Sequence, residues 1–585
     1  MLASARRHAT IDDVVAARER VVSDLDSKYA RAISVVRDHL LDGVPLFLGY
    51  SGGKDSTVAL CLALEGLRQA RDAHAPLPAL TVLSTDTGID NPAVAAYRNR
   101  MLAQLRRHAA RHGLDVRIVV PRPSLSDSWV VSVIGGRGLP TFPESSSRDC
   151  SVSLKVVPAR RALATAAAAW RAECATRART AVGGAFFRLH DMADHPHPPV
   201  IILGTRFDES ARRAVNMTTR GDRARQISVN ADGDHTLPLI ADFDTDDVWT
   251  YLALASSKPD AAYPGFAPDF AETVRIYRDA AGGECVIVAD ARGVKKGGGC
   301  GARHGCALCT AVDQDRSMSA MLTMPGHRYM QPLNALREYL IATRFDWTRQ
   351  RWTPRRVTPE AVVDGALVLQ PSAYGAAEVE SLLRYALTID ALERDRAEVA
   401  GEPPRFQIVT AEQLILIDFM WARYGLHRPF HALAIYREVC IEGRRFPVPT
   451  IETPAPKTPI PNRRVAIDHG QATAMPGLSD PLVAALAFEG GSDAIADRAP
   501  RFEVNAEAIG FLLDYDLDRL LDLYHDGGFA PGAAVGWYLR SGIVATSGRG
   551  IADTDSMMRH AQWLESEIGV NHVPAAAPLP RDVAA

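Results

Sequence analysis

The sequence lacks any apolar run of the about 18–20 residues that a membrane-spanning helix requires. No apolar segment follows Arg6 and Arg7, so we expect no secretory signal. Eight cysteines among 585 residues are too few for a disulfide scaffold. These features argue against a membrane protein and a disulfide-rich secreted protein, and we expect a cytoplasmic location.

An excess of positive charge is also missing. Lys and Arg together number 66 and Asp and Glu 69, which gives a net charge of −3 with neutral histidines. Any contact with nucleic acid must therefore come from a local patch or from a partner protein. The chain is 47% hydrophobic and 23% charged, values that exclude a wholly disordered or fibrous protein.

Short apolar runs alternate with helical stretches in the first half of the sequence. The patterns predict strands at 44–50, 79–85, 115–120 and 200–204, and helices at 11–40, 57–70 and 161–181. This alternation predicts an α/β fold, a parallel sheet with helices on both faces. Ligands of such sheets bind outside the carboxyl ends of the strands.

The chain divides into five predicted regions. They are an N-terminal helix (1–43), the α/β domain (44–330), a helical region with Arg and Trp (331–447), a Pro-rich linker (448–462) and a helical C-terminal domain of unknown role (463–585). The linker is inferred from five prolines in residues 448–461.

Two further segments carry local predictions. Residues 184–199 hold three His and three Pro and are expected to form a loop. The acidic segment Asp242–Asp247 precedes a predicted helix. Negative charge stabilises a helix start, so we favour this interpretation over a metal site, with Thr245 as a plausible cap.

A Gly-rich turn follows the first predicted strand. It consists of Ser51, Gly52, Gly53, Lys54, Asp55 and Ser56. The two glycines let backbone N–H groups face an anion, the following helix start adds a partial positive charge, and Lys54 adds a full one. The spacing differs from the GxxxxGK[ST] loop of kinases and GTPases. The segment predicts a phosphate-binding loop.

Three more motifs follow at predicted strand ends or close behind them. They are Ser84-Thr-Asp-Thr-Gly88, Arg148-Asp-Cys150 with Leu154-Lys155 and Pro158, and Gly204-Thr-Arg206. The loop resembles the SGGxDS loop of the PP-loop ATP pyrophosphatases, which split ATP between its α- and β-phosphates. The other motifs resemble the DTG, R-x-C…L-K…P and G-x-R elements of the PAPS reductase branch.

The resemblance implies a role for each motif. Residues 51–56 would hold the phosphates of ATP. Asp86 would lie near the nucleotide and help to position Mg²⁺. The side chains of Arg148, Lys155 and Arg206, next to Gly204, would neutralise charge on the α-phosphate region. Lys54, Asp55, Asp86 and Arg206 are the catalytic candidates; a structural ion pair is the alternative role for Arg206.

Three cysteines lie within ten residues, at Cys300, Cys306 and Cys309, and Cys285 precedes them. Four thiolates can hold either zinc or a [4Fe–4S] cluster. The terminal catalytic cysteine of PAPS reductases, in an ECGLH-type motif, is missing. Cys61, Cys174 and Cys440 are expected to be core thiols.

The segment Gly305-Cys-x-x-Cys-Thr310, with Asp315 and Ser317-Met318, is similar to one in the DndC family of iron–sulfur DNA phosphorothioation proteins. The related Ssp type is the other close option. The resemblance implies a [4Fe–4S] cluster on Cys150, Cys306 and Cys309. Cys285 is favoured as the fourth ligand, because Gly283-Glu-Cys285 is similar to the family's G-E-C element, and Cys300 is the alternative.

Two Arg-rich stretches, 206–225 and 343–356, are candidates for nucleic-acid contact. In the second, arginines alternate with Phe345, Trp347 and Trp352, which suits phosphate contact and base stacking. A solvated helix face with buried Trp is the alternative, at nearly even weight.

The favoured function is DNA phosphorothioation, as in restriction–modification and phage defence. The chain would activate a backbone phosphate with ATP, releasing AMP and PPi, and sulfur would replace a non-bridging oxygen. The expected partners are DNA, a cysteine desulfurase as sulfur source and other phosphorothioation proteins, including a DNA-associated ATPase. The alternatives are tRNA thiolation by a PP-loop enzyme and PAPS or APS reduction.

Overall fold

The computed structural model describes residues 11–73, 76–140, 149–280, 305–353, 362–363, 366–461, 463–466, 475, 477–478, 502–525 and 532–568. The chain forms two compact units that interleave along the sequence. Unit 1 comprises Met1–Thr85, Ala93–Pro121 and Pro158–Arg303. Unit 2 comprises Asp86–Pro92, Arg122–Val157 and His304–Ala585. This division into two units does not test the boundaries of the five predicted regions, which stay predictions.

A six-stranded sheet lies at the centre of unit 1, in the order β3-β2-β1-β4-β6-β5. Its strands are β1 (Leu46–Gly49), β2 (Leu80–Leu83), β3 (Val116–Val119), β4 (Val200–Leu203), β5 (Ser228–Val229) and β6 (His235–Pro238). All neighbours pair in parallel except β5 and β6. The four predicted strands and the α/β fold class are confirmed, whereas β5 and β6 were not predicted.

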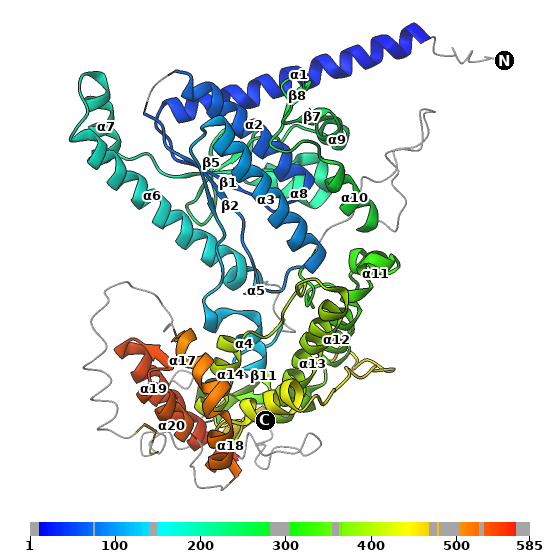
Figure 1. Ribbon diagram of the computed structural model, residues 1–585, viewed down its shortest axis with the longest axis vertical. Coiled ribbons are helices and arrows are strands. Elements are labelled where there is room, and N and C mark those ends of the chain that lie inside the picture. Colours follow the sequence, from blue (N-terminus) through cyan, green and yellow to red (C-terminus); the bar gives the residue numbers. More distant parts are fainter. Residues whose placement is uncertain are drawn as a thin grey trace, which may run out of the picture. The chain divides into compact units, whose positions relative to one another are not determined.

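The helices of unit 1 cover both faces of the sheet (Figure 1). They are α1 (Ile11–Leu41), α2 (Lys54–Arg71), α3 (Pro92–His112), α6 (Val157–Ala178), α7 (Gly184–Asp194), α8 (Ala211–Thr219), α9 (Thr245–Leu254) and α10 (Ala271–Ala280), with η3 (Phe207–Glu209) and the small strands β7 (Ala255–Ser256) and β8 (Tyr263–Pro264). Parallel crossovers are right-handed. The order β1-β2-β3 therefore puts α2 and α3 on one face, and the return to β4 puts α6 on the other.

The predicted loop at 184–199 is wrong for its first part, because Gly184–Asp194 forms α7. The three prolines lie at 196, 198 and 199, so they leave the preceding residues free to form a helix. Leu189 and Met192 of α7 pack against Trp170 and Cys174 of α6. Figure 1 shows α7 beside the end of α6.

Unit 2 is mainly helical. Its helical elements are η1 (Leu125–Asp127), α4 (Trp129–Ile134), α5 (Asp149–Ser151), η2 (Val152–Val156), α11 (Arg316–Leu322), η4 (Pro325–Met330), α12 (Gln331–Thr343), η5 (Trp347–Arg349), α13 (Ala376–Ala400), α14 (Ala411–Arg423), α15 (His431–Tyr436), η7 (Arg437–Ile441), α17 (Ala506–Phe511), η9 (Leu512–Asp516), α18 (Leu517–His525), α19 (Ala533–Arg540) and α20 (Gly548–Ile568). Its strands are β9 (Gln350–Thr353), β10 (Val362–Val363), β11 (Ala366–Tyr374), β12 (Arg463–Ala466), β13 (Phe502–Val504) and β14 (Val544–Thr546).

The prediction of a helical region at 331–447 is wrong at β9, β10 and β11. Val368, Leu369 and Gln370 lie in β11, which pairs antiparallel with β9, β10 and β12. The apolar and β-branched residues of this run favour a strand once edge partners are present. Helices α13, α14 and α15 confirm the remainder of the prediction.

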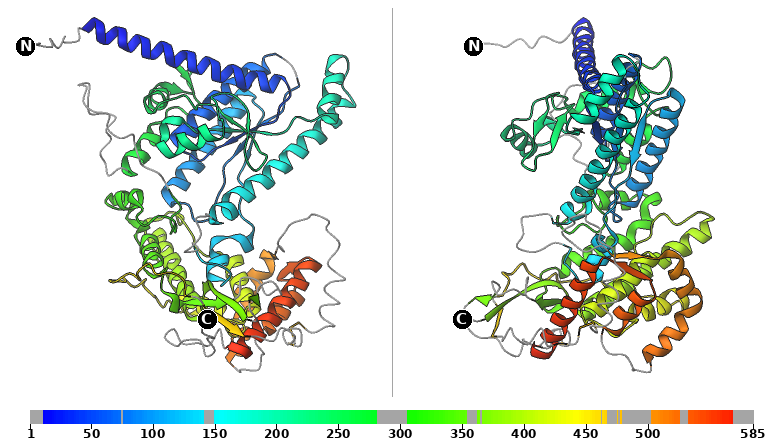
Figure 2. Two further views of the ribbon diagram at one scale, coloured as in Figure 1. Left: turned by 180° about the vertical axis from the view of Figure 1, so that it is seen from behind. Right: turned by 90° about the vertical axis from the view of Figure 1, so that its left-hand side faces the viewer.

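The C-terminal helices share one core with α13–α15. Ile509, Leu512 and Leu520 belong to the same buried cluster as Ile417 and Phe419 of α14. The buried carboxylate of Asp418 accepts a hydrogen bond of 3.0 Å from the Tyr538 hydroxyl. In both views of Figure 2 the orange and red helices lie against the yellow α14. These helices are therefore integral to unit 2. None of the described helices is long and apolar enough to cross a membrane.

Candidate functional site

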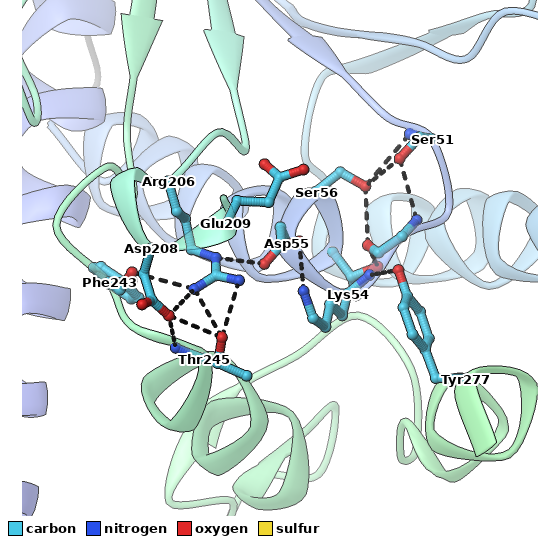
Figure 3. A network of polar contacts seen from close by, with 12 residues as sticks. Ser51, Lys54, Asp55, Ser56, Arg206, Asp208, Glu209, Phe243, Thr245 and Tyr277 are labelled. Atoms are coloured by element: carbon cyan, nitrogen blue, oxygen red, sulfur yellow. Dashed lines mark hydrogen bonds and ion pairs between the residues drawn. The ribbon is translucent and has the colours of Figure 1, made fainter. Parts of the chain in front are cut away.

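The phosphate-loop motif joins β1 to α2 (Figure 3). The helix begins at Lys54, three residues before the predicted start, so the turn itself is short. Gly52 has a φ of +76°, a conformation that disfavours residues with a Cβ. The Ser51 and Ser56 hydroxyl oxygens lie 3.1 Å apart, and the Gly53 N–H donates to Ser51 Oγ at 3.2 Å. These bonds hold the loop closed around the helix start.

A buried charge cluster lies at the start of α2 (Figure 3). Lys54 Nζ is 2.8 Å from Asp55 Oδ2, and Arg206 Nε donates to Asp55 Oδ1 at 2.7 Å. Lys54 is 5% exposed and Arg206 1% exposed. Asp55 thus bridges the two cations, and Asp208 Oδ2 lies 3.5 Å from Arg206 Nη1 as a second carboxylate. The expected grouping of Lys54, Asp55 and Arg206 is present in the structure.

Arg206 is held in place by acceptors from a second loop. Its Nη1 donates to the Phe243 carbonyl at 3.3 Å and to Thr245 Oγ1 at 3.4 Å. Thr245 Oγ1 in turn donates to Asp208 Oδ2 at 2.9 Å. These contacts fix the guanidinium rather than leaving it on a solvated side chain. The structural ion pair and a ligand-binding role for Arg206 are compatible.

Gly204 allows the end of β4 to approach the start of α2. A Cβ on Gly204 would lie 2.9 Å from both Asp55 C and Ser56 N, which is backbone on backbone. The chain leaves β1 toward β2 and β3 and then returns to β4 on the other side. The loop and Gly204 therefore meet at the topological switch point, where α/β sheets bind ligands.

The acidic segment before α9 is a helix start, as expected, but its cap is Asp244 rather than Thr245. Asp244 Oδ1 accepts the Asp247 N–H at 2.7 Å, and Asp247 Oδ2 accepts the Asp244 N–H at 2.9 Å. Each carboxylate accepts the backbone N–H of the other residue, and this reciprocal pair of hydrogen bonds is a capping box. The side chain of Thr245 serves Arg206 and Asp208 instead.

Three residues of this site were not predicted. The Tyr277 hydroxyl accepts the Lys54 N–H at 3.2 Å. Arg98 packs over Gly52, and its Nη1 donates to the Thr85 carbonyl at 3.1 Å. Ser84 Oγ, at the end of β2, is buried without a hydrogen-bond partner among the described residues. No local motif marks Tyr277 or Arg98, because both come from helices distant in sequence.

The DTG motif after β2 belongs to unit 2 beyond Thr85. Asp86 pairs with Arg122 at 2.9 Å, and its Oδ1 accepts the Gly88 N–H at 3.0 Å. Thr87 Oγ1 lies 3.9 Å from Cys306 Sγ, and the Ala307 N–H donates to the Ile89 carbonyl at 2.7 Å. The DTG segment therefore holds the cysteine loop. Arg148 lies outside the described residues, so its predicted role stays a prediction.

Cys150, Cys306 and Cys309 converge in unit 2. Burial raises the pKa of the Cys150 thiol, and the nearby Cys309 raises it further. Burial also raises the pKa of the Cys306 thiol, while Lys155 lowers it. Electrostatic influence of this kind requires proximity, so the three thiols and Lys155 form one site. Cys285 and Cys300 lie outside the described residues, and the choice between them stays a prediction.

The spacing of these thiols bears on which metal suits them. A single zinc ion would bring its thiolates to about 3.8 Å from one another, given bonds of about 2.3 Å. Among the described residues, no three cysteine sulfurs lie mutually within 4.8 Å. A cubane cluster binds each thiolate to a different iron atom and spaces them more widely. The three thiols are donors that either a [4Fe–4S] cluster or zinc accepts, so the cluster stays a prediction from the family resemblance.

Helix α12 fixes the backbone of the cysteine loop. Arg337, which is fully buried, donates to the carbonyls of Cys309 at 2.8 Å and Val312 at 2.6 Å. Arg344 donates to the Thr310 carbonyl at 3.0 Å. Of the three predicted core thiols, Cys61 and Cys174 are buried, and burial raises their pKa to about 12 and about 11. Cys440 is only partly buried, and its Sγ accepts a hydrogen bond from Arg394 at 3.3 Å.

The two Arg-rich stretches are largely engaged within their own units. Arg213 pairs with Glu209 and Arg225 with Asp242. In the second stretch, Arg351 and Trp352 are buried, and Arg349 pairs with Glu378 at 2.9 Å. The buried Trp352 agrees with the structural alternative, but residues 347–353 form η5 and β9 rather than a solvated helix face.

The match to a family model agrees with the motifs of the first half of the chain. Residues 45–261 match the phosphoadenosine phosphosulfate reductase domain, a PP-loop domain. No curated protein sequence matches the chain. Two solved structures of Candida glabrata FMN adenylyltransferase are similar at 13% and 12% identity, with TM-scores of 0.21 and 0.20. One contains FAD and pyrophosphate, the other FMN and the ATP analogue AMPCPP. The alignments cover 44% and 39% of this chain and 62% and 57% of theirs.

Proposed function

We propose that this protein is an AMP-forming ATP pyrophosphatase that activates a DNA backbone phosphate for replacement of one oxygen by sulfur. The PAPS reductase-type PP-loop domain supports the use of ATP. One observation carries the sulfur chemistry: Cys150 and the Cys306–Cys309 loop converge on the DTG segment in unit 2. A nucleotide motif and a thiol site thus share one structural unit.

Adenylation solves the chemical problem of this reaction. A non-bridging oxygen of the DNA phosphate attacks the α-phosphorus of ATP, and pyrophosphate leaves. The DNA phosphorus then carries AMP as a leaving group. Sulfide, released from the desulfurase persulfide by a thiol reductant that is oxidised to a disulfide, attacks that phosphorus. The new P–S bond forms as the P–O bond to AMP breaks, and AMP departs with the oxygen. The net change replaces oxygen by sulfur at the cost of one ATP.

The side chains of the loop would act on the first step. The N–H groups of the turn and the start of α2 bind the phosphates, and Lys54 adds a full positive charge. Arg206 neutralises negative charge on the α-phosphate region as pyrophosphate leaves. Asp55 is a positioning residue, since its two oxygens hold Lys54 and Arg206 at fixed places. Mg²⁺ would accompany ATP, with Asp86 as its candidate ligand.

The thiol site would hold a [4Fe–4S] cluster on Cys150, Cys306 and Cys309, with Cys285 as the favoured fourth ligand and Cys300 as the alternative. Bound there, a cluster can carry or relay sulfur. Burial raises the pKa of Cys306, and the nearby Lys155 offsets part of that rise. Arg337 positions the loop by holding the Cys309 carbonyl.

The remaining partners are also part of the proposal. A cysteine desulfurase would supply the sulfur, and other phosphorothioation proteins, including an ATPase that grips DNA, would supply affinity for DNA. The chain has a net charge of −3, and most arginines in the described parts of the Arg-rich stretches form ion pairs. Few positive charges therefore remain for contacts with DNA phosphates.

The test is mass spectrometry of nuclease-digested DNA and tRNA from cells with and without the gene. We expect phosphorothioate dinucleotides in DNA, their loss in Lys54→Ala, and their retention in the control Lys457→Ala, which changes an exposed lysine. Thiolated nucleosides lost from tRNA, with DNA unchanged, would instead support tRNA thiolation. Loss of neither, with loss of sulfate assimilation, would support a PAPS or APS reductase.

A further inference from the structure

Three potential metal ligands lie together in unit 2, apart in the chain from the thiol residues. They are Glu380 on α13, His427 in the connection after α14, and His431 at the start of α15. One ring nitrogen of each histidine and one oxygen of Glu380 all lie within 4.8 Å of one another. The two imidazole rings stack with centroids 4.7 Å apart. No other group of three such residues is found among the described residues.

The closest donor pair has the spacing of two ligands on one ion. His431 Nε2 lies 3.5 Å from Glu380 Oε2. That is longer than the about 2.7–2.9 Å of a charge-assisted hydrogen bond. Tetrahedral zinc with bonds of about 2.0–2.2 Å separates its ligand atoms by roughly 3.4 Å. Without a metal the two side chains form an ion pair, in which His431 lowers the pKa of Glu380, and their separation is also that of two ligand atoms on one cation.

The outer contacts orient the ligands. His427 Nε2 lies 3.0 Å from the Ala376 carbonyl. A carbonyl only accepts, so Nε2 carries the proton and Nδ1 keeps the lone pair that can bind a metal. Arg384 holds the other oxygen of Glu380, and its charge is shared with Glu438 at 3.0 Å. Histidines and carboxylates that bind metals are supported by such second contacts.

The backbone between the histidines is held in an unusual conformation. Phe430 has a φ of +61°, in the left-handed region that a bulky residue seldom adopts. Its N–H donates to Asp418 Oδ2 at 3.2 Å, and the Ala432 N–H donates to Asp418 Oδ1 at 2.9 Å. The buried Asp418 thus fixes the turn that brings His427 and His431 together. Conformations of this kind concentrate at ligand sites.

We propose that Glu380, His427 and His431 bind one divalent cation of the zinc class, with water as the fourth ligand. Two imidazoles and one carboxylate form a ligand set that suits zinc. The three residues are partly buried and His431 Nε2 itself is covered by protein, so the ion and its water would lie beneath the surface. The ion ties α13 to the turn between α14 and α15. This site has no thiolate and is separate in its ligands from the cysteines.

The test is titration of the purified full-length protein with Zn²⁺ against a chelating indicator, and with Co²⁺ as a spectroscopic probe. The variants are His431→Ala and Glu380→Gln, the second of which keeps the side-chain shape. The control is His560→Ala, a partly buried histidine on α20. All four proteins keep every cysteine, so a difference in Zn²⁺ binding between them cannot come from the loss of a thiol ligand. Thermal unfolding is recorded with and without Zn²⁺.

We expect the wild type and His560→Ala to bind one equivalent of Zn²⁺ that the other two variants bind at least about 100-fold more weakly. The corresponding Co²⁺ absorption carries no sulfur charge-transfer band, and Zn²⁺ raises the unfolding temperature only where the equivalent binds. Equal Zn²⁺ binding by all four proteins would overturn the proposal. So would a Co²⁺ spectrum in which the lost equivalent shows sulfur ligation.

Discussion

Replacing Gly204 by alanine tests whether the close approach of β4 to the phosphate loop matters for ATP turnover. The added Cβ would lie 2.9 Å from Asp55 C and Ser56 N and 3.0 Å from Asp55 O, whereas ordinary contacts begin at 3.4 Å. Neither partner is a flexible side chain. The start of α2 must therefore move by about half an ångström, because a packed interior cannot absorb the overlap.

That movement displaces Asp55 and with it the anchor of Lys54 and Arg206. Since a misplacement of about 1 Å can cost about 100-fold in rate, we expect kcat/KM for ATP to fall by about tenfold or more. Overpacking should also lower the free energy of unfolding by about 1–3 kcal/mol. Pyrophosphate release gives the rate, and chemical denaturation gives the stability.

The matched control is Gly184→Ala, because a Cβ at Gly184 meets no atom within 4 Å. We expect its rate to match the wild type and its stability to change by no more than about 0.5 kcal/mol. The reasoning is refuted if Gly204→Ala turns over ATP within about twofold of the control.

Other substitutions probe the remaining sites. Asp55→Asn leaves the 1% exposed Arg206 without its carboxylate, so chemical denaturation should show a loss of about 1–3 kcal/mol together with loss of turnover. Cys150→Ser should lose the iron found by elemental analysis, whereas the buried Cys174→Ser retains it; stoichiometric zinc without iron in the wild type would contradict this. Phe511→Asp, at a side chain 60% exposed, should abolish co-purification of a partner without changing the unfolding temperature, and unchanged co-purification would remove this docking surface. Burial raises the pKa of Asp390 to about 7 in the folded protein. As pH rises, this carboxyl therefore loses its proton in the unfolded chain before it does in the folded protein. The stability of the wild type relative to Asp390→Asn should therefore fall between about pH 4 and pH 7, and a flat difference would contradict the assignment.

Substituting the exposed Phe511 tests docking more sharply than truncating the chain near residue 460. Docking to other subunits is a role we propose for residues 463–585. However, Ile509, Leu512 and Leu520 belong to the core that also contains α14. Truncation would expose that core, so lost activity would not distinguish docking from unfolding.

The sequence predicted the sheet and the loop because their signals are local. Short apolar runs marked the strands, and the glycines and Lys54 marked the turn that follows β1. The match of residues 45–261 to the reductase domain agrees with those motifs. Local signals failed where partners decide the structure. Residues 366–374 become a strand because β9 and β12 pair with them, and Gly184–Asp194 forms a helix because α6 covers it.

The candidate sites followed the same rule. Arg206 could be predicted from its motif, but its burial beside Asp55 depends on Gly204 and on the loop that carries Thr245. Tyr277 and Arg98 come from helices with no recognisable motif. The approach of Cys150 to the Cys306–Cys309 loop joins distant segments, and only the family resemblance predicted it.

Product analysis of ATP turnover tests the central claim most directly. The purified protein is incubated with ATP, Mg²⁺ and DNA, and the nucleotides and phosphates are separated by chromatography. Because the loop is of the PP type, cleavage should fall between the α- and β-phosphates. The account predicts AMP and pyrophosphate in equal amounts, lost in Lys54→Ala and retained in Lys457→Ala. ADP and inorganic phosphate as the main products would contradict it.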